Sequence, residues 1–202
     1  MNNLEEILLS ELPNFWEKSL KFLNGDISKP EYKGFSGGYG VYAQRDKKSF
    51  MIRLRTSCGV LSKSQLYTIY NMAYENKLEK IHLTTRQAIQ LHGLTVEQIC
   101  NIMEEGIHKD IFTRGGGGNF PRNVGLSPLS GVDPDEAFDV TPYAVATDKH
   151  FISKITTYHL PRKLKVSYSS SNNDDAHCTV QDLGFIATLK DNKPYFNVYV
   201  GG

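Results

Sequence analysis

Cysteine is scarce in this sequence. Its 202 residues include only Cys58, Cys100 and Cys178. Their odd number and wide spacing exclude a disulfide framework and a Cys-x-x-Cys metal site. Cysteine usage of this kind is typical of a protein from a reducing compartment. We therefore expect a cytoplasmic location.

Long apolar runs and a dominant charge are also lacking. No stretch approaches the ~18 apolar residues of a membrane span, and Glu5 and Glu6 stand where a secretory signal needs basic residues. Lys and Arg number 23 against 22 Asp and Glu, which argues against nucleic acid or a membrane as a partner. Any functional cationic patch must be local.

The first forty residues carry a helical pattern followed by loop-forming residues. Apolar residues recur at helical spacing through 4–23, and Pro13 predicts a division into two helices. Residues 24–40 are rich in Gly, Ser and Pro and predict a linker or loop. We assign residues 1–38 to an N-terminal helical segment with its linker.

A hairpin is predicted next. Residues 41–44 and 50–55 flank a polar turn. Residue types alternate through 50–55, so Arg53 and Arg55 share the strand face opposite the apolar residues. This strand is the first of a longer pattern.

Two capping boxes, at Ser62 and Thr95, predict helices that end near Lys77 and Ile107. Strands are expected at 80–85, 88–93 and 111–114. The order over residues 49–114 is then β-α-β-β-α-β, the split βαβ arrangement of ferredoxin-like folds. We assign residues 39–116 to this domain.

The remaining residues, 117–202, predict an α/β unit. Thr141-Pro142 marks a helix start, with the helix running to about Thr156. Strand-like runs follow at 160–169, 184–190 and 194–200. The expected fold class is α+β: the helical segment, the ferredoxin-like domain and this unit.

Basic residues recur where predicted strands meet loops, which is where sites tend to be built. They are Arg53, Arg55, Arg86, Arg122, Arg162, Lys163 and Lys165. If they converge, they form a cage for a polyanion, whereas each alone is more often a solvated surface residue. The glycine tetrad Gly115–Gly118 either places backbone N–H groups around an anion or is a flexible loop. The six histidines show no metal-ligand spacing, so no metal site is predicted.

Seven strings recur in a characteristic order and spacing: Gly40–Arg45, Phe50–Arg55, Leu83–Gly93, Asn119–Val124, Ser127–Pro134, Leu160–Lys165 and Phe196–Gly202. Taken together, they resemble the siroheme-dependent sulfite and nitrite reductases. The ordered set covers about residues 39–202 and is far more specific than any single string. Thr56–Gly59 departs from the family, which usually has a proline and paired glycines there.

The resemblance implies a siroheme coupled to a [4Fe-4S] cluster, and an electron donor such as ferredoxin or a flavoprotein. The residues that it implies bind the substrate anion and supply protons are Arg53, Arg122, Lys163 and Lys165. The residues that it implies for the siroheme cradle are Thr84, Arg86, Gln90 and His92, with Arg55 and Asn119 as weaker candidates.

Lys165 indicates the substrate. In this family, sulfite reductases tend to read P-R-K-x-K and plant-type nitrite reductases P-R-K-x-N. The resemblance therefore favours reduction of sulfite to sulfide, with nitrite to ammonia as the alternative. A rival from another class is a non-catalytic ferredoxin-like module that binds a small anion or RNA, although the net charge of +1 argues against RNA.

The four cluster cysteines of the family, a C-x5-C and a later C-x3-C, are absent, and a [4Fe-4S] cluster needs four ligands. We therefore expect this chain to be the N-terminal half of such an enzyme, inactive alone and without a cluster. Its partners would be the missing C-terminal half or a second copy of itself. The final strand, Phe196–Val200, would leave an exposed edge for either.

Overall fold

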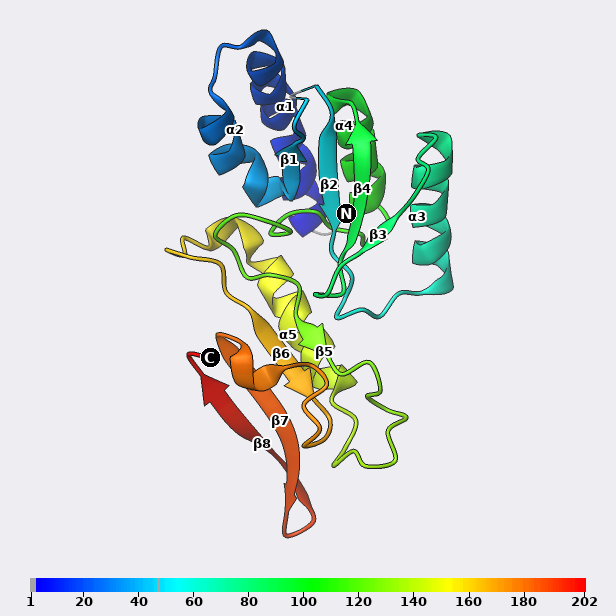
Figure 1. Cartoon of the computed structure of the whole chain (residues 1–202), viewed down its shortest axis with the longest axis vertical. Helices are drawn as coiled ribbons and strands as arrows, with labels where there is room; N and C mark the ends of the chain where they lie inside the picture. Colours follow the sequence, from blue (N-terminus) through cyan, green and yellow to red (C-terminus); the bar gives the residue numbers. More distant parts are fainter. Residues whose placement is uncertain (1–2, 47) are drawn as a thin grey trace. The chain divides into compact units, whose positions relative to one another are not determined.

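The computed structural model describes residues 3–46 and 48–202, and the chain divides into two compact units (Figure 1). Unit 1 comprises Met1–Thr56 and Leu61–Gly118, and unit 2 comprises Ser57–Val60 and Asn119–Gly202. The described part of each unit holds a four-stranded sheet, ordered β1-β2-β4-β3 in unit 1 and β5-β6-β7-β8 in unit 2. The predicted α+β class is confirmed.

Unit 1 begins with helix α1 (Asn3–Asn24), which runs unbroken through Pro13. The prediction of two helices is therefore wrong. Pro13 removes one backbone hydrogen bond, but it lies on the exposed side of the helix. Leu8, Phe15 and Phe22 are buried on the other side. Packing of that apolar face outweighs the local cost of the proline.

The prediction of a loop over residues 24–40 is wrong for residues 29–39. Helix α2 (Lys29–Ser36) and the 3-10 turn η1 (Gly37–Tyr39) lie there. The Ser28 hydroxyl accepts a hydrogen bond from the Glu31 N–H at 3.3 Å, and Pro30 lies in the first turn. Serine at the cap and proline in the first turn are helix-start signals, which the glycine content of the segment obscured.

The sheet of unit 1 contains strands β1 (Val41–Ala43), β2 (Phe50–Leu54), β3 (His82–Leu83) and β4 (Ile89–Leu94). The helices that follow β2 and β4 are α3 (Lys63–Glu75) and α4 (Val96–Ile107). The β1–β2 hairpin and the antiparallel β3–β4 pair are confirmed. Both capping boxes are present, at Ser62 and Thr95.

The last strand of the predicted pattern does not form. Residues 111–114 have no strand assignment, and β1 occupies the place beside β2 instead. A backbone hydrogen bond from Arg55 N–H to Phe112 O, at 2.7 Å, continues that edge past the end of β2. The sheet neighbour of β2 therefore comes from the segment before it in the chain.

Alternation along β2 decides which side chains face the core of unit 1. Phe50, Ile52 and Leu54 are fully buried in that core. Because neighbouring side chains on a strand point to opposite faces, Arg53 lies on the other face of the sheet.

Unit 2 consists of strands β5 (Gly125–Leu126), β6 (Val166–Ser169), β7 (Leu183–Lys190) and β8 (Lys193–Val200), helix α5 (Thr141–Ser153) and the 3-10 turns η2 (Ile155–Thr157) and η3 (Cys178–Val180). β5, β6 and β7 are parallel, and β7 and β8 form an antiparallel hairpin. Cys58, from the short segment Ser57–Val60, is 1% exposed in the core of this unit.

Helix α5 and strand β6 of unit 2 have bounds that differ from the predictions. Helix α5 ends at Ser153, and the chain then tightens into η2 before Thr157. Strand β6 begins only at Val166, since the residues before it make a single bridge, Pro121 to Leu164. Proline has no N–H to donate, which limits pairing there. No described helix is long and apolar enough to cross a membrane.

Candidate functional site

The first group of predicted site residues lies on the face of the unit 1 sheet opposite the core. β2 and β4 pair so that Arg53 is opposite Gln90 and Met51 is opposite His92. With the Gln90 amide oxygen turned toward Arg53, it accepts from Nε at 3.2 Å and from Nη2 at 2.8 Å. Arg53 Nη1 donates to Gly116 O at 2.7 Å, and its guanidinium lies 5.9 Å from the centre of the Tyr42 ring. The Arg53 guanidinium is thus positioned by Gln90, by the Gly116 carbonyl and by the Tyr42 ring.

His92 continues this network. In the same Gln90 orientation the amide nitrogen donates to His92 Nε2 at 3.1 Å. Burial lowers the pKa of His92, and the positive charges of His82, Lys80 and Arg53 lower it further. The imidazole is therefore neutral at neutral pH, which matches its role as an acceptor from Gln90.

Arg55 and Arg86 lie beside the ends of the same strands. Arg55 is 4% exposed, and its Nη1 donates to Gly115 O at 3.3 Å. Arg86 is half-buried in the β3–β4 turn. The Thr84 hydroxyl accepts from the Ala88 N–H at 3.0 Å, so this side chain organises the turn that carries Arg86. Thr84 therefore stabilises the β3–β4 turn through its own hydrogen bond, independently of any ligand.

The glycine tetrad differs from a cradle of free amides. The N–H groups of Gly115 and Gly116 donate to Gly38 O and Thr113 O, both at 2.8 Å, and Gly118 N–H donates to the Tyr42 hydroxyl at 3.2 Å. The carbonyls of Gly115 and Gly116 accept from Arg55 and Arg53. The tetrad therefore supplies acceptors that orient arginines, and these three amides are committed inside unit 1.

Close backbone approach explains why glycine is needed here. A Cβ on Gly117 would meet the Tyr42 hydroxyl at less than contact distance, and Gly37 O at 2.5 Å. Gly40 has φ +75°, and a Cβ there would lie 2.6 Å from Thr113 O. Both positions bring backbone against backbone beneath the arginines.

The second group of predicted site residues lies in unit 2, just before β5 and β6. Arg122 N–H donates to Leu164 O at 2.8 Å, and Leu164 N–H donates to Phe120 O at 3.2 Å. Asn119 Nδ2 also braces this pair of segments through Pro161 O at 3.1 Å. The two basic segments are therefore neighbours in space.

Register places three cations on one side of this pair. Pro121 bridges Leu164 in parallel, so Arg122 alternates to the same side as Lys163 and Lys165. Lys163 is exposed and Lys165 half-buried. Arg162 alternates away from them. That the unit 1 and unit 2 groups converge on one ligand stays a prediction.

Residue types in these two groups suit a polyanion. Guanidinium forks recognise carboxylates in bidentate fashion, and lysines add mobile positive charge. Siroheme, with its many peripheral carboxylates, is a group that this donor set fits. Sequence reasoning missed Tyr42 and the Gly115 and Gly116 carbonyls. The β1–β2 register, which pairs Tyr42 with Met51, would have placed Tyr42 beside this face.

An iron–sulfur cluster does not fit the thiols of this chain. Burial raises the pKa of Cys100 to about 11, and burial with the Asp174 charge raises that of Cys178 to about 12. Cys100 belongs to unit 1, whereas Cys58 and Cys178 belong to unit 2. Within the residues that the structure describes, no three or more His, Cys, Asp or Glu side chains gather as a metal site would require. Four thiolates in one pocket are not available here.

A large open groove lies elsewhere in unit 1. Its volume is about 860 Å³, and its lining includes Leu66, Tyr70, Ile81 and Leu83. None of its lining residues is a predicted site residue. Its apolar walls suit neither sulfite nor a polycarboxylate, so the arginine-bearing face remains the candidate site.

Comparison with known proteins defines the class. Residues 42–106 match the nitrite/sulfite reductase ferredoxin-like half domain, and residues 117–202 match the nitrite and sulphite reductase 4Fe-4S domain. These two domain types together account for the α+β organisation of the chain. The chain belongs to the siroheme-dependent nitrite and sulfite reductase family.

Relatives include both nitrite and sulfite reductases. An assimilatory ferredoxin-dependent nitrite reductase of Haloferax mediterranei is 30% identical over 95% of this chain and 35% of the relative. A ferredoxin sulfite reductase of Mycobacterium tuberculosis is 29% identical over 87% of this chain and 35% of the relative. The solved Mycobacterium tuberculosis NirA protein matches with a TM-score of 0.80 at 26% identity, over 98% of this chain and 40% of that one. The chain spans about a third of the length of these curated relatives.

Proposed function

We propose that this chain is part of a siroheme-dependent enzyme that reduces sulfite to sulfide. The observation that carries the proposal is the pairing of the Arg122 segment with the Lys163–Lys165 segment through Leu164. This pairing sets Arg122, Lys163 and Lys165 on one side. The two lysines belong to the string P-R-K-x-K, which favours sulfite as the substrate. Nitrite reduction to ammonia is the second candidate, supported by relatives named as nitrite reductases from Haloferax mediterranei and Synechococcus elongatus.

Each site residue has a proposed task. Arg53, Arg122, Lys163 and Lys165 bind the substrate anion, and the two lysines deliver protons to it. Arg55, Thr84, Arg86, Gln90, His92 and Asn119 form or support the cradle for the siroheme carboxylates. When bound, siroheme supplies the iron at which the anion is reduced.

The electron path depends on partners. Relatives are named as ferredoxin-dependent or as components of NADPH sulfite reductase, so we infer that a ferredoxin or a flavoprotein supplies the electrons. The buried, high-pKa thiols of this chain are poor cluster ligands. We infer that the thiolates of the [4Fe-4S] cluster come from polypeptide outside these 202 residues, and that these residues alone do not turn over sulfite. A cytoplasmic setting stays a proposal that rests on cysteine usage.

Sulfite titration of the siroheme-loaded chain, followed by absorbance, tests the proposal. Substituting Arg122→Met or Lys163→Met should weaken sulfite affinity about 10- to 100-fold, since a charge-assisted hydrogen bond contributes about 1.5–3 kcal/mol. Lys149→Met, at an exposed lysine of α5, is the matched control and should bind as the unchanged chain does. Equal affinity for all four proteins would contradict the proposal.

The rival reading as a non-catalytic anion- or RNA-binding module is tested with the same protein. Fluorescence anisotropy with a labelled single-stranded RNA should show no binding at about 150 mM salt. A chain that binds this RNA but not siroheme would favour the rival. Binding of siroheme alone would favour the reductase.

A further inference from the structure

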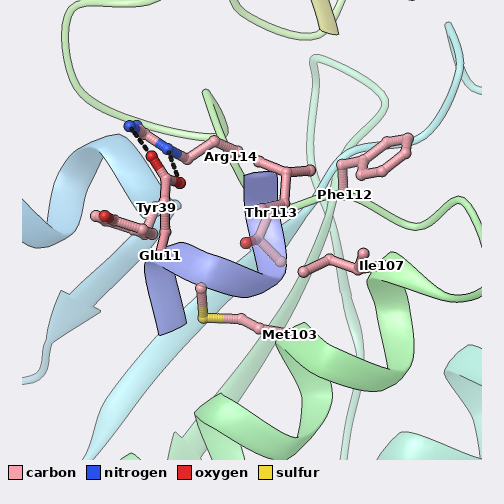
Figure 2. A pocket seen from close by; sticks show the side chains of 8 residues that line it. Glu11, Tyr39, Met103, Ile107, Phe112, Thr113 and Arg114 are labelled. Carbon is pink, nitrogen blue, oxygen red and sulfur yellow. Dashed lines mark hydrogen bonds and ion pairs between the residues drawn. The ribbon is translucent and has the colours of Figure 1, made fainter. Parts of the chain in front are cut away.

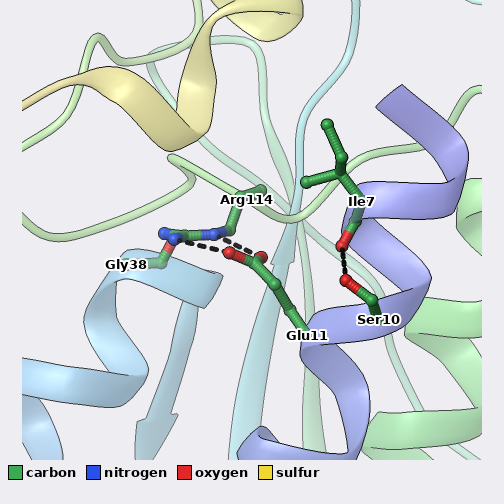
Figure 3. Close-up of polar contacts among 5 residues, drawn as sticks. All are labelled: Ile7, Ser10, Glu11, Gly38 and Arg114. Carbon is green, nitrogen blue, oxygen red and sulfur yellow. Dashed lines mark hydrogen bonds and ion pairs between the residues drawn. The ribbon is translucent and has the colours of Figure 1, made fainter. Parts of the chain in front are cut away.

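A largely buried ion pair joins helix α1 to the residue before the glycine tetrad (Figure 3). The Glu11 carboxylate accepts from Arg114 Nε at 2.9 Å and from Nη2 at 3.2 Å, a bidentate arrangement. The two side chains are only 22% and 15% exposed. The Arg114 guanidinium also lies 4.5 Å from the centre of the Tyr39 ring. This is a more constrained contact than an ordinary surface ion pair.

The surroundings of the pair are mostly apolar. Leu8, Met103, Ile107 and Phe112 line the same small pocket as Glu11 and Arg114 (Figure 2). Exclusion of water strengthens a charge pair whose geometry is already good, and it raises the cost of losing one partner. The pair is therefore expected to hold one geometry.

Arg114 connects directly to the backbone that orients the site arginines. Its Nη1 donates to Gly38 O at 3.1 Å, and the N–H of the next residue, Gly115, donates to the same oxygen at 2.8 Å. The Gly115 and Gly116 carbonyls then accept from Arg55 and Arg53. An unbroken series of contacts thus runs from Glu11 to both arginines.

We propose that Glu11 is a positioning residue for Arg53 and Arg55, acting through Arg114 and the Gly115 and Gly116 carbonyls. Four consecutive glycines carry a large conformational entropy, so carbonyls on such a loop orient a guanidinium well only if the loop is anchored. The Glu11–Arg114 pair is that anchor at its N-terminal end. The proposal rests on the proposed function only in taking the substrate anion as the ligand of Arg53 and a siroheme carboxylate as the ligand of Arg55.

The first test compares Glu11→Gln with Glu17→Gln. Glu17 is also on α1, but its ion pair with Lys21 is exposed, so it is a matched control. Siroheme titration of the full chain should give about 10-fold weaker affinity for Glu11→Gln and an unchanged affinity for Glu17→Gln. Equal affinity of both variants would overturn the proposal.

A double-mutant cycle separates positioning from general stability. If Glu11 acts through Arg55, the Glu11→Gln change should weaken siroheme binding in the unchanged chain but have at most half that effect, on a logarithmic scale, beside Arg55→Met. Fully additive effects would show that Glu11 acts independently of Arg55. If Glu11→Gln fails to fold, Arg114→Lys, which keeps the charge but loses the bidentate contact, enters the same cycle.

A ligand-free measurement keeps this inference distinct from the proposed function. In an NMR spectrum of the chain, the Arg53 Nε–H should exchange slowly with solvent, and Glu11→Gln should speed that exchange at least about 10-fold. Glu17→Gln should not change it. If Arg55→Met leaves siroheme affinity unchanged, the proposed siroheme cradle is wrong, while the exchange rate still decides whether Glu11 positions Arg53.

Discussion

Cys100 and Cys178 are held in the neutral thiol form by burial, which raises their pKa values to about 11 and about 12. Because only the thiolate is nucleophilic, we predict that iodoacetamide at pH 8 modifies Cys100 at least about 100-fold more slowly in the native chain than in urea, as two pKa units imply. Peptide mass mapping over time measures the two rates. Equal rates would contradict the burial of this thiol.

The raised pKa values of Cys100 and Cys178 also make the stability of the fold depend on pH. The folded-state pKa of each thiol lies above its unfolded value near 9. As pH rises past 9, the unfolded chain releases protons that the folded chain keeps, so these thiols should lower the free energy of unfolding between about pH 9 and pH 12.

Gly40 should tolerate no side chain. A Cβ there would lie 2.6 Å from Thr113 O on a backbone with φ +75°, so we predict that Gly40→Ala lowers the free energy of unfolding by about 2 kcal/mol or more. Gly34→Ala is the matched control, since it lies in α2 with nothing within 4 Å of its Cβ. That change should raise stability by about 0.5–1 kcal/mol. Urea midpoints that move in the same direction would contradict this difference.

At the scale of elements, Pro13 lowers the stability of helix α1, and a substitution can remove that loss. Pro13 is exposed in the middle of a 22-residue helix and cannot donate its backbone hydrogen bond. We predict that Pro13→Ala raises the free energy of unfolding by about 1–3 kcal/mol. Urea unfolding followed by circular dichroism measures this. A loss of stability would mean that α1 depends on the proline geometry.

Local signals in the sequence predicted local structure correctly. The capping boxes at Ser62 and Thr95 and the β1–β2 hairpin involve residues a few positions apart, so the information lies within one short window. Pro13 misled because the burial of Phe15 and Phe22 against the core is not visible in that window. The missing strand at 111–114 has a different cause, since β1 lies only a few positions before β2 and occupies the edge that the distant segment 111–114 would have used.

Part of the candidate site could likewise be predicted from the sequence, and part could not. Arg53 was placed on the correct strand face by alternation alone, and resemblance supplied Gln90 and His92, which lie beside it. The link from Arg53 to Gly116 spans 63 positions, and the link from Arg114 to Glu11 spans 103. No spacing rule predicts such contacts, because they depend on how α1 and the glycine tetrad fold against the sheet.

At the scale of the whole molecule, β8 is an open edge. It is the outermost strand of its sheet, and its residues are exposed except for Phe196. Edge strands of this kind pair with other chains, so we predict concentration-dependent dimers of the purified chain in analytical ultracentrifugation. Val198→Lys should shift the chain to monomer, whereas Val180→Lys, at an exposed valine of η3, should not. A monomer at all concentrations would contradict self-association through β8.

Residues 57–60 limit where this chain can be cut into pieces that fold separately. These residues leave the sequence of unit 1 to join unit 2, and Cys58 is buried there with Val124 and Leu126. A protease cut after Gly118 would therefore leave two pieces still held together by that buried loop, and they should co-elute on a sizing column. An expressed piece beginning at Asn119 would lack part of its own core. Split-protein or domain-swap engineering of this chain must carry the 57–60 loop along with the second unit.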